Sequence, residues 1–529
     1  MSSLHSWCTG RKLPSGNRSD QGRPVKRVRS HASRTVTRPR SDSRRAQPCG
    51  PLGSLPGQTT RFTGGTVRHR PHTLAAGCAL AAGCALAAAL LTAPLALAAP
   101  ATAAAPAPVG APPKADFDRD GRTDVVSAAP ASTVDGQERA GYVSVVYGAS
   151  GRHQTLTSAT PEAGQAFGGD SAARDLDGDG YTDLAVQDRS TVVVHWGSAT
   201  GLSAQATPLP ASVRAGGFPL TEGDFDGDGH ADLVATDSDP DAEWGELRVL
   251  YGPFDRDGAP ARSAGLSTGR TFEPTGMVAG DITGDGRDDL VTTHAFEEMS
   301  ESTQFWAGTA SGLSATAKSL PDAASAAIGD VDKDGRGDLV IRTVPGDVVE
   351  NLPYDAGTIK VLYGTASGPS TSRTTTLTQN SAGVPGASEE GDQFGYDLAA
   401  GDSNGDGYAD IAAGVPYEDL AGAAGGGKDA GSVILLKGGP SGLTGTGAKA
   451  FHQDTAGVPG VAEAGDRFGS SVALPAGLGL VAGAPTEDTA AGTSSGAAWL
   501  RLGISGTYAV NPGDLQAPAA GAEFGTYLR

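Results

Sequence analysis

Three things are scarce in this 529-residue sequence, and each absence excludes a class of structure. All four cysteines (Cys8, Cys49, Cys78 and Cys84) lie before residue 85, so disulfides cannot hold the remainder together. After residue 99 no apolar run approaches the roughly 20 residues that a membrane-spanning helix needs. Basic residues are outnumbered after residue 73, where the net charge is −33, and such a surface repels nucleic acid.

The first part of the chain has the opposite character. Residues 1–73 carry 15 Lys and Arg against two Asp, and their Arg, Ser, Pro and Gly content predicts a basic disordered leader. Residues 74–103 hold an uncharged apolar run and two small-residue cleavage motifs, ending at Ala98 and Ala103, which is typical of a secretory signal peptide. Residues 104–114 form an Ala/Pro linker. The sequence therefore predicts a secreted protein, with either cleavage site open.

The basic leader is longer than an ordinary signal peptide. Translation from Val67 through a non-AUG codon would place Arg68, His69 and Arg70 directly before the apolar run, which is a normal signal peptide. The alternatives are therefore a start near residue 67 and a genuine disordered arm. N-terminal sequencing of the precursor distinguishes them.

One nine-residue pattern, Asp-x-[Asp/Asn/Thr]-x-Asp-Gly-x-x-Asp, occurs six times between residues 116 and 410. Oxygen side chains at positions one, three, five and nine and the backbone carbonyl at position seven can surround one hard cation, and glycine at position six permits the turn. A single such loop is ordinarily a polar turn, but six copies in register predict calcium binding, with up to six ions. The predicted ligands are Asp116, Asp118, Asp120, Arg122, Asp124, Asp175, Asp177, Asp179, Tyr181, Asp183, Asp224, Asp226, Asp228, His230, Asp232, Asp281, Thr283, Asp285, Arg287, Asp289, Asp330, Asp332, Asp334, Arg336, Asp338, Asp402, Asn404, Asp406, Tyr408 and Asp410.

Three other signatures recur in step with these loops, which we number one to six in chain order. Some loops are preceded by Phe-Gly, and some are followed by a strand that ends in small residues and Pro. The third signature, an alternating apolar segment that ends in a glycine turn, predicts a strand, and no sustained helical period appears. One unit then holds four strands in about 50 to 75 residues, the size of a propeller blade. The alternating segments are 142–148, 191–197, 246–252, 303–308, 358–364, 432–438 and 497–503.

This unit resembles the FG-GAP repeat of the integrin α-subunit N-terminal propeller and of bacterial FG-GAP or VCBS repeat proteins. The resemblance covers residues 115–529 and implies an all-β fold, a seven-bladed β-propeller of four-stranded blades. Blade seven has Leu-Pro-Ala-Gly-Leu-Gly (474–479) where an Asp loop should be, so we expect no calcium there. Thr283 and Asn404 at position three lower the ligand charge of loops four and six, and we expect weaker sites.

The two ends of the repeat array are complementary. Blade one begins at its Asp loop with no Phe-Gly strand before it, whereas the last residues contain a Phe-Gly strand with no loop after it. We therefore expect residues 522–528 to pair with blade one as its innermost strand and to close the ring.

The predicted calcium is structural rather than catalytic. Each loop gathers carboxylates that repel one another without a cation, so metal binding and folding are coupled. Weak sites suffice in an extracellular protein because the medium supplies calcium. Chelation should therefore lower the melting temperature.

No catalytic residues are predicted, and the candidate ligand surface lies elsewhere. Gly492–Gly496 matches the Gly-x-Ser-x-Gly pattern but lies between two strands rather than on a strand-to-helix elbow. The resemblance implies ligand binding opposite the calcium loops, where segments 379–395 and 453–469 match at eleven of seventeen positions. Solvated loops without a partner are the alternative. The candidate contact residues are Glu389, Glu390, Asp392, Tyr417, Glu418, Asp419, Glu487 and Asp488.

Two classes of function remain open. The first is a secreted, monomeric, calcium-binding propeller for recognition or adhesion, which binds a cell-surface or extracellular glycan, polymer or protein and no nucleic acid. The second is a secreted hydrolase or lyase that acts on polysaccharide or a lipid anchor through the face opposite the calcium loops. The first is favoured because no segment outside the propeller could hold catalytic machinery.

Overall fold

The computed structural model describes residues 115–148, 151–238, 245–421 and 427–529. The predicted leader, signal-peptide region, cleavage sites and linker lie outside these residues. The described chain is strand and turn, apart from short 3-10 helices at Ala211–Val213, Pro345–Asp347 and Val349–Tyr354. A search of the described residues finds no helix with the length and apolarity needed to span a membrane.

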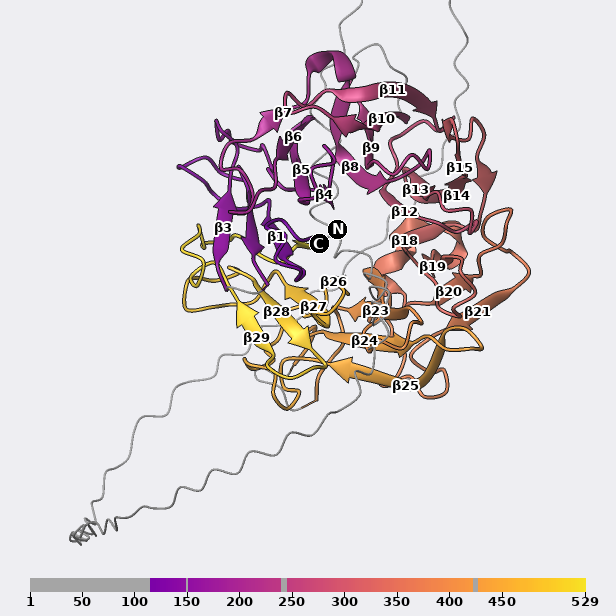
Figure 1. Ribbon diagram of the computed structural model, residues 1–529. Coiled ribbons are helices and arrows are strands. Elements are labelled where there is room, and N and C mark those ends of the chain that lie inside the picture. The colour runs from indigo at the N-terminus through magenta and orange to yellow at the C-terminus, as the bar shows by residue number, and fades with distance from the viewer. Residues whose placement is uncertain (1–114, 149–150, 239–244, 422–426) are drawn as a thin grey trace, which may run out of the picture. The chain divides into compact units, whose positions relative to one another are not determined.

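Seven four-stranded antiparallel sheets follow one another around a ring (Figure 1), and the prediction of a seven-bladed propeller is confirmed. From the inside outward, blade one consists of β30 (Tyr527–Leu528), β1 (Val125–Ala129), β2 (Tyr142–Val146) and β3 (His153–Leu156), and blade two of β4 (Ser171–Arg174), β5 (Asp183–Asp188), β6 (Thr191–His195) and β7 (Thr207–Pro208). Blade three consists of β8 (Ala215–Gly223), β9 (Asp232–Asp237), β10 (Glu246–Phe254) and β11 (Pro260–Ser267), and blade four of β12 (Gly276–Gly280), β13 (Asp289–Phe296), β14 (Met299–Trp306) and β17 (Lys318–Ser319). Blades five to seven consist of β18 (Ala323–Gly329), β19 (Asp338–Thr343), β20 (Ile359–Leu362) and β21 (Thr374–Leu377); β22 (Leu398–Gly401), β23 (Asp410–Val415), β24 (Ser432–Lys437) and β25 (Thr444–Phe451); β26 (Ser471–Ala473), β27 (Leu480–Ala484), β28 (Ala497–Leu502) and β29 (Tyr508–Val510). A small hairpin of β15 (Gly308–Thr309) and β16 (Gly312–Leu313) precedes β17.

The seven alternating segments form the third strand of each blade. Their side chains are buried on both faces because neighbouring blades pack face to face, as in β2, where all five residues are buried. The hydrophobic clusters accordingly combine adjacent blades: Val143 and Tyr147 of blade one share a cluster with Leu184 and Val193 of blade two. The core of the described chain thus lies between blades.

The Phe-Gly signature joins four of the blades to the blade before them in the ring. Phe468 is fully buried, and its backbone N–H donates to Ala430 O beside Gly431 of the preceding blade. A Cβ added to Gly431 would lie 2.4 Å from Phe468 O, and Gly431 has φ +87°, so only glycine fits. The same arrangement is repeated at three further Gly and Phe pairs, Gly141 with Phe167, Gly357 with Phe394, and Gly496 with Phe524.

The last pair closes the ring as predicted. Phe524 packs against Gly496 of blade seven, and the chain then continues into β30, which pairs with β1 through Ser127↔Leu528 and Ala128↔Tyr527. Paired backbone hydrogen bonds between Val126 and Arg529 (3.0 and 3.1 Å) extend this contact. Figure 1 shows the indigo first blade beside the yellow seventh. The paired strand is shorter than the predicted 522–528, because the Phe-Gly turn is held by blade seven and only the residues after it lie beside β1.

Antiparallel order fixes two faces of the propeller. Each Asp loop leads into the second strand of its blade, and each glycine turn connects the third strand to the fourth, so both lie on one face. The connections from second to third strand, and from one blade to the next, lie on the opposite face. Segments 379–395 and 453–469 are connections of this second kind.

Candidate metal centres

The Asp at position one shapes each loop through its own carboxylate. One of its oxygens accepts a hydrogen bond from the N–H of the position-six glycine in all six loops, at 2.7–3.0 Å. The position-five carboxylate in turn accepts the N–H of position seven. These short-range bonds fold the loop and leave the position-seven carbonyl free to bind a cation.

The Asp at position nine begins the second strand, or directly precedes it in loop one, and is fully buried in all six loops. Its Oδ1 accepts the N–H of the glycine that ends the third strand, at 2.7–3.1 Å. In loops one to five its Oδ2 accepts the N–H of position two, at 2.8–3.0 Å. Position nine therefore fastens the Asp loop to the glycine turn beside it.

The glycines of these turns are site residues that the predicted ligand set does not include. A Cβ on any of them would lie 2.2–2.5 Å from the carbonyl oxygen of loop position eight. The sequence could have identified these glycines as part of the site, because each glycine turn recurs in step with an Asp loop. The six residues are Gly148, Gly197, Gly252, Gly308, Gly364 and Gly438.

In four loops the carboxylates of positions one, three and nine converge. One ligand oxygen from each lies within 4.8 Å of the others, a spacing that one cation can bridge. Among the described residues, the position-five carboxylates are not part of these groups, and loops four and six form no such group, since Thr283 and Asn404 replace the third acid. The four groups are Asp116, Asp118 and Asp124; Asp175, Asp177 and Asp183; Asp224, Asp226 and Asp232; and Asp330, Asp332 and Asp338.

Orphaned oxygens at position three support a metal in these groups. Asp118 Oδ1 and Asp332 Oδ1 are buried and have no hydrogen-bond partner among the described residues. A buried carboxylate oxygen without a donor is costly unless a cation meets it. The donor set is oxygen only, which suits calcium better than transition metals. The residues present therefore fit a bound calcium ion, which carboxylates would hold and which would neutralise their repulsion.

Family models match five stretches of the chain. An FG-GAP-like repeat model matches residues 175–235 and 224–292, and two FG-GAP repeat models match residues 111–146, 394–436 and 458–500. The matched ranges contain Asp loops one, two, three, four and six and the first two strands of blade seven. The chain is an FG-GAP repeat protein. Its propeller resembles that of the integrin α-subunit.

No curated protein matches this FG-GAP chain. Among solved structures, an Agrocybe aegerita lectin that recognises non-reducing terminal N-acetylglucosamine is 13% identical, with a TM-score of 0.37, over 63% of this chain and 80% of its own. The Dos1 propeller is 11% identical, with a TM-score of 0.35, over 75% and 85%. The V. cholerae biofilm matrix protein Bap1 is 15% identical, with a TM-score of 0.23, over 47% and 40%.

A guanidinium faces position three in each of the four acidic groups of the FG-GAP propeller. Arg152 pairs with Asp118 at 3.0 Å, and Arg262 pairs with Asp226 at 2.6 Å. Each guanidinium also stacks on the aromatic residue before a glycine turn, as Arg262 does on Tyr251, 3.2 Å from the ring centroid. The same arrangement is repeated by Arg256 with Asp177 and Trp196, and by Arg373 with Asp332 and Tyr363. Arginine thus holds one oxygen of position three in each group. The other oxygen is the orphaned one in loops one and five, and in loops two and three it accepts the N–H of position five.

Burial of position nine raises its pKa strongly. The pKa values of Asp124, Asp183, Asp232 and Asp338 rise to about 7, chiefly because burial disfavours the charged form, against hydrogen bonds from backbone N–H groups that lower them. The pKa of Asp289 in loop four rises to about 6 for the same reason. Without metal these sites favour a proton, and a divalent cation would replace it.

Loop six differs because a lysine supplies its positive charge. Lys437 Nζ donates to Asp410 Oδ2 at 2.8 Å and to Ser403 Oγ at 2.7 Å. Lys437 stands directly before the Gly438 turn, where blades one, two, three and five carry Tyr or Trp. With Asn404 neutral and Asp410 already paired, this loop presents the least charge to calcium.

On the face opposite the Asp loops, the same hydrogen bond from a buried Gln to a Glu occurs twice. Gln379 Nε2 donates to Glu418 Oε2, and Gln453 Nε2 donates to Glu487 Oε2, both at 2.7 Å. Burial, with repulsion from Asp466, raises the pKa of Glu487 to about 8, and burial raises the pKa of Asp392 to about 7. Of the eight candidate contact residues, Asp392 is buried and turns its carboxylate to the N–H of Glu389, so it cannot contact a partner. Glu389, Glu390, Asp419 and Asp488 are exposed.

Proposed function

We propose that this protein is an exported, calcium-stabilised FG-GAP propeller that acts in recognition or adhesion. The observation that carries the calcium part is the set of four converging Asp groups, two of which have an orphaned buried oxygen. We infer four tight calcium sites, a weaker one in loop four and the weakest in loop six. The ions would act structurally, because each neutralises the repulsion among the carboxylates of a loop that position nine fastens to the turn beside it.

Export rests on the sequence. The basic segment, apolar run and small-residue cleavage motifs before residue 104 form a signal-peptide pattern. An extracellular medium suits these loops, because sites as weak as about 10⁻⁴ to 10⁻³ M are filled there, so even the weaker loops four and six would bind calcium. The protein would work there as a monomer.

The proposed partner is a cell-surface or extracellular glycan, polymer or protein. It would contact the face opposite the calcium loops, where the enlarged connections of blades six and seven present Glu390, Asp419 and Asp488 to solvent. The connections are held in place by the buried glutamines and by the Phe-Gly turns, so they form a pre-organised surface.

A glycan and wall-polymer binding screen, with and without calcium, tests this proposal. We expect binding in calcium, with a loss of about tenfold or more when Glu390, Asp419 and Asp488 are changed together to Gln or Asn. A matched variant removes three exposed acids from the same face of blades four and five, through Glu297→Gln, Asp347→Asn and Glu350→Gln. It tests whether net charge alone explains the effect, and equal losses in both variants would refute the assignment to blades six and seven.

A hydrolase or lyase is the second candidate, and one observation favours it. Asp466 and Glu487 lie in hydrogen-bond contact. Burial, with repulsion from Glu463, raises the pKa of Asp466 to about 6, and burial, with repulsion from Asp466, raises that of Glu487 to about 8. Carboxyl groups that hold a proton near neutral pH are suited to general acid catalysis. A turnover assay on each polymer that binds distinguishes the candidates, since Glu487→Gln should abolish turnover by an enzyme and spare simple binding.

A further inference from the structure

The junction between blades six and seven lacks an aromatic wedge that fills other described junctions. In blade one, Tyr147 Oη accepts the N–H of Leu202 in blade two, at 2.9 Å. In blade three, Tyr251 Oη accepts the N–H of Leu313 in blade four, at 3.1 Å. Each tyrosine precedes a glycine turn and reaches across to the next blade. In blade six that position is Lys437.

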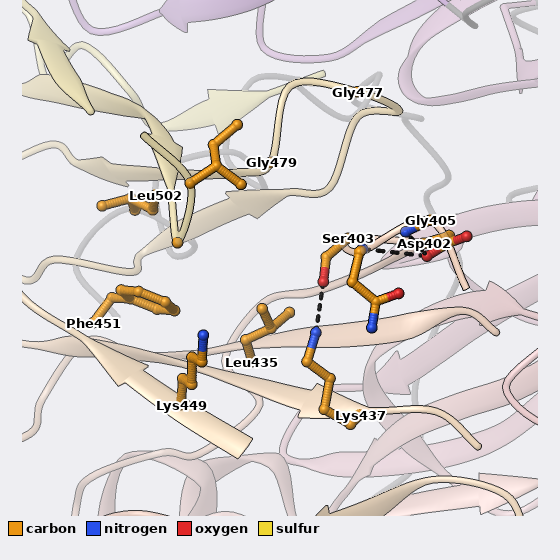
Figure 2. Close-up of a pocket in the computed structure, with 13 residues that line it drawn as sticks. Asp402, Ser403, Gly405, Leu435, Lys437, Lys449, Phe451, Gly477, Gly479 and Leu502 are labelled. Atoms are coloured by element: carbon orange, nitrogen blue, oxygen red, sulfur yellow. Dashed lines mark hydrogen bonds between the residues drawn. The ribbon is translucent and has the colours of Figure 1, made fainter. Parts of the chain in front are cut away.

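The Lys437 side chain points away from blade seven, and blade seven has only a short glycine-containing segment facing the junction. Its ammonium group binds Ser403 and Asp410 of its own blade, as Figure 2 shows for Ser403. Across the junction stands the short segment with Gly477 and Gly479 that replaces an Asp loop. The result is a cavity of about 410 Å³ on the calcium-loop side of the propeller.

The cavity has an apolar floor and one positively charged side chain that forms no ion pair with a described residue. Leu435, Phe451 and Leu502 are almost completely buried and form the floor, while Ile504 is 37% exposed. Lys449 lies at the rim, is exposed, and has no ion pair or hydrogen bond with any described residue. Figure 2 shows its amino group beside the Phe451 ring and Leu435.

The negative charge at the rim is turned away from the cavity. The two oxygens of Asp402 accept the N–H groups of Gly405 and Gly407, both at 2.7 Å, so they serve the loop. Asp410 is neutralised by Lys437. Among the charged side chains that line the cavity, Lys449 is therefore the one whose ammonium group has no partner in the described part of the chain.

We propose that this cavity binds a small organic monoanion, a carboxylate of about eight carbons in all with an apolar chain. The body would cover the Phe451, Leu502 and Ile504 side chains, and the carboxylate would pair with Lys449. The volume lies in the range of small-molecule sites, which are largely apolar with a few directing polar groups. This site is separate from the face assigned to recognition, so either proposal can fail without the other.

Methyl NMR of calcium-saturated protein tests the site, because the chain has only seven isoleucines and Ile504 alone lines the cavity. Octanoate should shift the Ile504 δ1-methyl signal saturably by about 20 mM, where a site of millimolar affinity is filled. Octanamide, which lacks the charge, should bind about tenfold more weakly. Lys449→Gln should weaken octanoate binding by a similar factor.

Lys428→Gln is the matched control, because Lys428 is 74% exposed and pairs with Asp429 away from the cavity. It should leave the titration unchanged. An unmoved Ile504 signal, equal binding of octanamide, an unaffected Lys449→Gln titration, or simultaneous shifts of all seven isoleucines would each overturn the proposal.

Discussion

At the scale of single residues, the Asp at position nine has two roles that can be separated. Asp232 accepts two backbone N–H groups, from Phe225 and Gly252, and belongs to one of the four metal groups. If Asp232 only bound metal, its replacement would not change the stability of the calcium-free protein. The geometry indicates otherwise, because an amide offers an acceptor to only one of these donors.

We predict that Asp232→Asn destabilises the protein both with and without calcium. In chelator the free energy of unfolding should fall by about 1–3 kcal/mol, because a buried N–H loses its acceptor. In calcium the number of tightly bound ions should also fall by one. Melting curves and isothermal titration calorimetry measure the two effects. Asp257→Asn, in an exposed turn nearby, is the control and should change neither.

Lys437 makes a second prediction possible at this scale. It acts as a built-in cation for Asp410, which is fully buried, while Lys437 keeps a side-chain exposure of 20%. Lys437→Met should lower the stability of the chelated protein by about 2 kcal/mol or more, since it leaves a buried carboxylate unpaired.

The same substitution should increase calcium binding. With the ammonium gone, loop six regains a free position-nine carboxylate, and we expect one additional ion at millimolar calcium together with recovery of stability. Lys360→Met, on the third strand of blade five, controls for loss of a lysine. An unchanged number of bound ions would mean that Lys437 does not occupy the role of the metal.

At the scale of elements, the Phe-Gly turn is a clamp between blades rather than a loose connection. Its strength depends on the absence of a Cβ at the facing glycine, not only on the positive φ there. Gly431 and Gly457 have nearly the same φ, +87° and +89°, but a Cβ at Gly457 would meet nothing within 4 Å. The pair therefore separates backbone strain from steric exclusion.

Gly457→Ala should cost about 1 kcal/mol, which is the strain of a left-handed alanine. Gly431→Ala should cost at least about 2 kcal/mol more, because its Cβ would lie 2.4 Å from Phe468 O and the blades must separate to accept it. Urea unfolding of both variants gives the comparison. Equal costs would show that the Phe-Gly contact contributes nothing beyond local strain.

The closing strand is the element on which the ring depends. Deleting residues 522–529 removes β30, the buried Phe524 ring and the backbone bonds to Val126, and it opens blade one at its inner edge. We predict loss of the single cooperative melting transition, with exposed apolar surface detectable by dye binding. A melting transition like that of the full chain would show that closure does not limit stability.

The repeat made most of this architecture predictable from sequence, and the limits of that prediction lie between blades. Seven alternating strands, six loops and two complementary ends were enough to expect seven blades and their closure, because every copy reports the same local structure. The pairing of Arg256 with Asp177 joins blades three and two, and no local pattern encodes it. The cavity beside Lys437 likewise depends on how two blades meet.

At the scale of the whole molecule, calcium and pH should act on stability together. Above about pH 6.5 the carboxylates of the unfolded chain have lost their protons, whereas the four position-nine Asp residues, with pKa near 7, still hold part of theirs in the calcium-free fold. The folded state then binds more protons than the unfolded state, so stability falls as pH rises through 7. The buried His195 and His294, whose pKa values are lowered by burial, stay neutral in the fold while the unfolded chain gives up their protons near pH 6.5. They therefore add an opposing slope at the lower end of this range, which is smaller than that of the four Asp residues.

We therefore predict that the chelated protein loses on the order of 3 kcal/mol of stability between about pH 6.5 and 8.5, with a fall of several degrees in melting temperature. Saturating calcium should remove most of this slope, because the ion binds the deprotonated carboxylates. The residual slope would come from Asp392 and Glu487 on the other face, whose pKa values are also raised, and Glu487→Gln should reduce it. Scanning calorimetry at several pH values in chelator and in calcium measures all three effects. Parallel pH profiles in the two conditions would contradict the coupling of metal to the position-nine carboxylates.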